Sequence, residues 1–230
     1  MKKQFTQEEI MDLLNKLYEQ CVDGIDKAGF KKISKSVTDL ADDYLDKYDD
    51  IETASKKFIN YQLTKCTTSG FLTGLGGLIT LPIAIPANIS SVLYVQMRMI
   101  AALAYMGGYD LKSDQVQTLV YATLAGVGLG GIVKDTGIKM GNKLAIAMID
   151  KIPTAALKTI NQKVGFRLIT KFGSKGVINL GKVVPVAGGV ISGGFDFVET
   201  KAIAKRARKL FIDGELYTIS DEPDYTDIAI

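Results

Sequence analysis

Residues 66–97 have the sequence CTTSGFLTGLGGLITLPIAIPANISSVLYVQM, which contains no charged side chain. Pro82 and Pro86 divide this stretch, because proline removes a backbone donor and crowds the preceding turn. Two helical arms are therefore predicted, and the second runs from about Asn88 to Met106. Each arm has roughly 15 to 20 residues, close to the roughly 20 that span a bilayer. Such helices either form a buried core or contact a membrane.

Glycine recurs at three- and four-residue spacing in three nearly uncharged regions of the chain. Small residues on one helix face allow a second helix to approach closely. The predicted helix-packing glycines are Gly70, Gly74, Gly77, Gly126, Gly130, Gly189 and Gly193. Because no strand-length alternation of apolar and polar residues occurs, the sequence predicts an all-α fold, a helical bundle with glycine-rich, tightly packed apolar helices.

The first 65 residues predict an amphipathic helical module. Thr6 and Glu9 form a capping-box pattern, and apolar residues then recur at the i, i+3, i+4, i+7 spacing of a buried helical stripe. Ser113 is predicted to cap a later helix. We expect three regions, namely this module at 1–65, a glycine-rich region of apolar and basic helices at 66–212, and a flexible acidic tail at 213–230.

The composition excludes two common kinds of site. The 230 residues include no histidine, and Cys21 and Cys66 form no CxxC pair, so neither a zinc site nor a disulfide framework is predicted. We expect no metal and no cofactor. The amino terminus turns acidic and amphipathic soon after its two lysines, unlike a secretory signal, which favours a cytoplasmic location.

Charge is strongly partitioned along the chain. Residues 134–212 hold fifteen Lys and Arg against four Asp and Glu, a net +11, whereas the whole chain carries +3 and residues 213–230 carry −6. A basic block beside an uncharged one favours an anionic partner. The candidate lipid- or anion-binding residues are Lys163, Arg167, Lys171, Lys175, Lys201, Lys205, Arg208 and Lys209. A merely solvated basic face is the alternative, and no nucleic acid is expected because no groove-binding motif or aromatic stacking platform accompanies these residues.

Two features are compatible with an enzyme or a nucleotide-binding protein. The sequence GVGLGG matches G-x-G-x-x-G at Gly126, Gly128 and Gly131, with Asp150 at a distance suited to a ribose-binding acid. That motif requires a preceding strand, whereas LVYATLA continues a helical stripe. Arg98 and Asp110 are isolated charges that form either a buried functional pair or a structural one. No catalytic residue is assigned.

Two long segments resemble the EcsC family. They are FLTGLGGLITLPIAIPANISSVLYVQMRMIAALAYMGGYDLKSDQVQTLVYATLAG and GKVVPVAGGVISGGFDFVETKAIAKRARKLF. The positions similar to the family pattern are Gly74, Gly77, Pro82, Pro86, Arg98, Tyr109, Asp110, Pro185, Gly188, Gly189, Gly193 and Thr200. YMGGYD stands where a shorter YGYD-like turn is expected. The resemblance implies a bacterial helical protein associated with the cytoplasmic face of a membrane, and it implies no catalytic residues.

We therefore expect a non-enzymatic membrane-associated protein that is peripheral on, or partly inserted in, the cytoplasmic membrane. Its basic helices would bind anionic lipids and its apolar helices would contact the leaflet, with or without a protein partner at the membrane. A soluble helical scaffold or partner-binding module is the first alternative. An enzyme or nucleotide-binding protein that uses the GVGLGG loop is the second.

Overall fold

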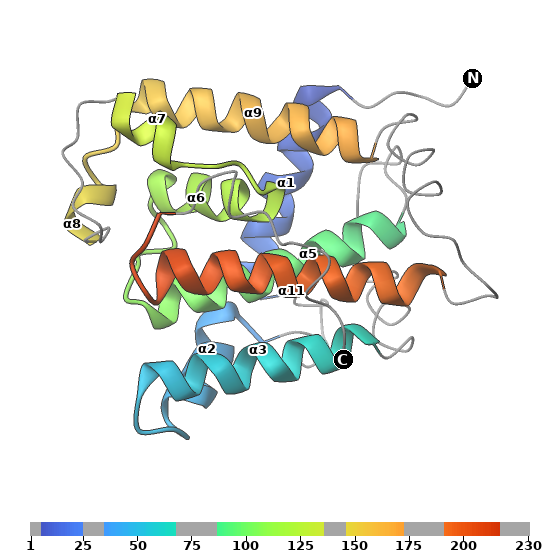
Figure 1. The fold of residues 1–230 in the computed structure, drawn as a ribbon, viewed down its shortest axis with the longest axis vertical. Coiled ribbons are helices and arrows are strands. Elements are labelled where there is room, and N and C mark those ends of the chain that lie inside the picture. Colours follow the sequence, from blue (N-terminus) through green and yellow to red (C-terminus); the bar gives the residue numbers. More distant parts are fainter. Residues whose placement is uncertain (1–5, 25–34, 68–86, 136–145, 173–190, 217–230) are drawn as a thin grey trace.

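The computed structural model describes residues 6–24, 35–67, 87–135, 146–172 and 191–216. These residues form nine helices and no strand, which confirms the predicted all-α fold (Figure 1). The helices are α1 (Gln7–Asp23), α2 (Val37–Leu45), α3 (Ile51–Thr67), α5 (Ala87–Met106), α6 (Asp114–Ala125), α7 (Gly130–Asp135), α8 (Ile146–Ile149), α9 (Thr154–Phe172) and α11 (Ile191–Phe211).

Side-chain caps begin the helices where the sequence predicted them. The Thr6 hydroxyl accepts the Glu9 N–H at 3.1 Å and the Glu9 carboxylate accepts the Thr6 N–H at 3.0 Å, so the capping box of α1 is confirmed. Ser113 caps α6 by accepting the Val116 N–H. These caps satisfy backbone donors that have no partner within the helix.

Helix α5 lies at the centre of the bundle and contacts α1, α2, α3, α6 and α11. Its side chains from Leu93 to Leu103 are buried except that of Arg98, and the side chains of α6 from Thr118 to Ala125 are also buried. The second arm of the uncharged stretch is thus a helix, as predicted, and its described side chains form the protein core. Gln96 lies within that core and donates to the Thr200 hydroxyl of α11 at 3.1 Å.

The helices are stacked in layers along the long axis of the molecule (Figure 1). Helix α9 lies at one end and α3 at the other, and α6 lies between α9 and α11. Helix α1 packs on both α5 and α9. Helices on the two sides of residue 65 therefore share one hydrophobic core.

Among the described residues, no helix combines the length and apolar character that crossing a bilayer requires. The first arm of the uncharged stretch lies outside the described residues. Several predicted residues also lie outside them, and these are Gly70, Gly74, Gly77, Lys175 and Gly189, together with the tail from residue 217.

Candidate anion-binding surface

Helices α9 and α11 carry nine of the nineteen Lys and Arg residues in the described ranges. Four cations and no carboxylate occur in α9, and five cations against two carboxylates give α11 a net charge of +3. We call these cations the basic surface, and its members are Lys158, Lys163, Arg167, Lys171, Lys201, Lys205, Arg206, Arg208 and Lys209. The net charge of these two helices together exceeds the +3 of the whole chain. They flank α6, whose own sequence contains no cation.

One member of the basic surface joins the two helices. Lys171 near the end of α9 forms an ion pair with Glu199 of α11, and both side chains are largely buried, with exposed fractions of 24% and 19%. The carboxylate neutralises this lysine within the protein. Lys171 therefore contributes less to binding an external anion than the sequence predicted.

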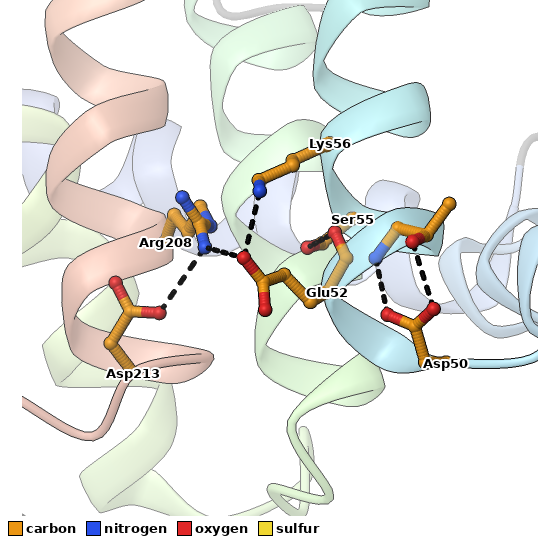
Figure 2. Close-up of polar contacts among 7 residues, drawn as sticks. Asp50, Glu52, Ser55, Lys56, Arg208 and Asp213 are labelled. Carbon is orange, nitrogen blue, oxygen red and sulfur yellow. Dashed lines mark hydrogen bonds and ion pairs between the residues drawn. The ribbon is translucent and has the colours of Figure 1, made fainter.

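Arg208 is held by carboxylates from two directions (Figure 2). Its guanidinium lies 3.3 Å from the Glu52 carboxylate of α3 and 3.6 Å from the Asp213 carboxylate. Lys56 lies 2.7 Å from the same Glu52 oxygen. The hydrogen bond from Lys56, with the charges of Lys56 and Arg208, lowers the pKa of Glu52. The Glu52 carboxylate thus stays ionised and keeps Arg208 near α3.

Gly126 has a role that its spacing did not predict, as the carboxyl-terminal cap of α6. It ends α6 in the left-handed conformation, with φ +69°, and its N–H bonds to carbonyls of the last turn. A Cβ atom built here would lie 2.5 Å from Arg206 Nη1 and 3.5 Å from Arg167 Nη2. The missing side chain lets guanidinium groups from α9 and α11 meet beside the carboxyl end of α6, where the helix dipole favours cations.

The other two described glycines that were predicted to pack helices lie in α7 and α11. Gly130 is buried at the start of α7, a short helix that contacts α9. Gly193 lies in the first turn of α11.

Four lysines form the outward part of the basic surface. Lys158 and Lys163 of α9 are exposed, as are Lys201 and Lys205 of α11. None of the four has a carboxylate partner within the part of the chain that the structure describes. These side chains can therefore reach an external anion without first breaking a described ion pair.

Arg98 and Asp110 do not make the buried pair that was one interpretation of the sequence. Arg98 donates to the Lys35 carbonyl at 2.7 Å. Asp110 is exposed in the turn after α5 and accepts the Lys112 N–H at 2.9 Å. The Asp110 carboxylate thus has a local backbone partner in this turn.

The GVGLGG motif does not lie in the strand–loop–helix setting that a dinucleotide-binding site needs. The segment LVYATLA belongs to α6, so no strand precedes the GVGLGG loop, and Asp150 is exposed just after α8.

Burial raises the pKa of the Cys21 thiol, and its sulfur lies 3.7 Å from the Tyr94 carbonyl, which it can bond only as a thiol. Among the described residues, no group of Cys, Asp and Glu side chains is arranged to hold a metal ion.

Three residues of this region did not attract attention in the sequence. Lys158 and Arg206 extend the basic surface, and Phe166 of α9 is 70% exposed. Helical spacing places Phe166 opposite the apolar stripe of its own helix, which was a usable signal. Arg206 and Arg167 both come near Gly126 only through tertiary packing, so no local sequence pattern predicted it.

Comparisons with protein-family models, with curated proteins and with solved structures found no match to this chain.

Proposed function

We propose that this protein is a non-enzymatic, membrane-associated helical protein of the EcsC type, which binds the cytoplasmic face of an anionic membrane through its basic surface. The single observation that carries the proposal is the pair of basic helices flanking α6. Lysines on both helices extend outward, and α9 has no carboxylate to balance them.

The energetic argument rests on repulsion between like charges. Lys201 and Lys205 are one helical turn apart and repel by a few tenths of a kcal/mol. An anionic surface removes that cost, and each Lys or Arg near an anionic bilayer contributes about 1 kcal/mol. Exposed lysines at the bilayer would therefore give reversible binding that weakens as salt screens the charges.

The apolar helices contribute differently from what their composition suggested. Most described apolar side chains of α5 and α6 are covered by neighbouring helices and form the core. In this part of the chain, lipid contact would come from the basic surface. The same observation favours the second candidate function, a soluble helical scaffold or partner-binding module in which the apolar helices only stabilise the fold.

Vesicle flotation separates the two candidates. Membrane association predicts that the protein floats at low salt with vesicles containing phosphatidylglycerol, and that it stays at the bottom with phosphatidylcholine vesicles. Added salt should release it. A protein that stays at the bottom with both vesicles at low salt would contradict membrane binding and leave the scaffold candidate.

A further inference from the structure

Phe166 is the most exposed large apolar side chain among the described residues, with 70% of its surface accessible. It lies in the second half of α9, whose opposite side buries Ile160, Val164 and Leu168. These three side chains belong to the core that α9 shares with α1 and α6. Phe166 therefore faces away from the bundle.

The position of α9 makes this face accessible to a large partner. The helix forms one end of the long axis, with α6 on its inner side and with α7 and the first turn of α1 at the level of α9 itself (Figure 1). Its 19 residues give a length of about 28 Å, since each residue rises about 1.5 Å. A flat surface could contact most of that length.

The side chains around Phe166 are basic or polar. With 3.6 residues per turn, exposed Lys158 and Lys163 lie on opposite sides of Phe166 around the helix. Gln162 and Thr170, four residues before and after Phe166, are also exposed. The helix has no carboxylate.

We propose that the outer face of α9 lies flat on an anionic lipid surface, with the Phe166 ring inserted among the lipid headgroups and Lys158 and Lys163 at the phosphates. This inference rests on the proposed membrane association and names the helix that makes the apolar contact. An aromatic ring with flanking lysines is typical of helices that lie in a bilayer interface. Lysines suit that depth because their alkyl chains pack on apolar material while their ammonium groups stay in water.

Charge and composition favour a lipid surface over a protein. A contiguous exposed apolar patch is one mark of a protein-binding site. The described side chains of α9 offer one exposed large apolar residue, and its exposed neighbours are lysines and polar groups. An anionic bilayer complements this arrangement, because its phosphates match the lysines and its interface accepts a single ring.

The chain contains no tryptophan, so a Phe166→Trp variant reports on this position alone. We expect its fluorescence emission to move to shorter wavelength with phosphatidylglycerol vesicles and to be quenched by brominated lipid acyl chains. Tyr61→Trp is the matched control, because Tyr61 is 46% exposed on α3 at the opposite end of the molecule. Its emission should not change.

Phe166→Ala gives an independent readout. The ring is exposed, so circular dichroism and thermal unfolding should match the wild type. We expect affinity for the same vesicles to fall about tenfold, which corresponds to about 1.4 kcal/mol.

The outcomes separate this inference from the proposed function. If the wild type floats with the vesicles but Phe166→Trp shows no shift and Phe166→Ala binds normally, the α9 orientation is wrong and membrane association stands. If the wild type does not float, both fail. A Phe166→Trp shift with soluble polyglutamate but not with vesicles would overturn the lipid surface in favour of an acidic protein.

Discussion

Gly107 lies directly against the backbone of Phe211, so that a Cβ atom built on the glycine would be 2.0 Å from the Phe211 carbonyl oxygen. The turn after α5 and the last residue of α11 meet at this point. The Tyr109 ring also packs edge-on against the Phe211 ring, with centroids 5.3 Å apart. This close approach fixes the carboxyl end of α11 and hence the position of Arg208 and Lys209.

Gly107→Ala should destabilise the protein by about 1–3 kcal/mol or more, because the obstructing atom belongs to a backbone and cannot rotate away. Gly131→Ala is the control, since a Cβ atom there meets nothing within 4 Å and the residue lies in α7. The control should be neutral or slightly stabilising. Urea unfolding compares the two, and equal stabilities would mean that the helices do not meet as closely as described.

Local signals in the sequence predicted the helices well. The Thr6 and Glu9 cap, the Ser113 cap and the apolar stripes all depend on residues within two turns of one another, and each appears where predicted. The sequence did not predict that Gly126 caps α6, because four-residue spacing does not distinguish a packing face from a carboxyl-terminal cap. The distinction depends on where α6 ends.

The basic surface was only partly predictable from the sequence. Exposure of Lys163, Lys201 and Lys205 follows from helical periodicity. The neutralisation of Lys171 by Glu199, and of Arg208 by Glu52, joins residues from different helices. No sequence pattern marks such pairs, because partner choice is set by packing of the core.

Release of Arg208 tests whether α11 meets the bilayer as well as α9. Glu52→Gln combined with Asp213→Asn removes both described carboxylates beside the guanidinium. If α11 meets the bilayer, one additional available arginine contributes about 1 kcal/mol and vesicle affinity should rise about fivefold, whereas contact through the outer face of α9 alone should leave affinity nearly unchanged. Because the Glu52 side chain is 61% exposed, loss of its pair with Arg208 should change the unfolding free energy little.

A second double variant controls for net charge. Asp12→Asn with Glu19→Gln makes the same change on exposed positions of α1. If both double variants bind vesicles equally, the gain would reflect total charge and the specific role of Arg208 would be contradicted.

Alkaline pH should unfold the protein through two buried tyrosines. Tyr18 donates to the Leu111 carbonyl at 2.7 Å and Tyr121 donates to Asn15 at 2.9 Å, with the two rings edge-on. Burial raises the pKa of both phenols above the ordinary value of 10.0. Above that pH the unfolded chain loses protons that the folded chain retains, so this contribution to stability is complete below pH 10 and declines above it.

Each tyrosine should add about 1.4 kcal/mol per pH unit to the decline. Urea unfolding at a series of pH values measures the slope. Tyr18→Phe and Tyr121→Phe should each reduce it, because each removes one buried phenol whose pKa is raised. A wild-type slope of zero above pH 10 would contradict the burial of both rings.

The most direct test of membrane binding compares two triple variants with the same net charge. Lys163→Gln, Lys201→Gln and Lys205→Gln remove three exposed members of the basic surface, and Lys16→Gln, Lys57→Gln and Lys112→Gln remove three exposed lysines elsewhere. Each set lowers the formal charge from +3 to 0. We predict that flotation with phosphatidylglycerol vesicles at low salt is lost in the first variant, because about 3 kcal/mol of binding is removed, and is largely retained in the second. Equal flotation of the two variants would contradict membrane binding through the basic surface.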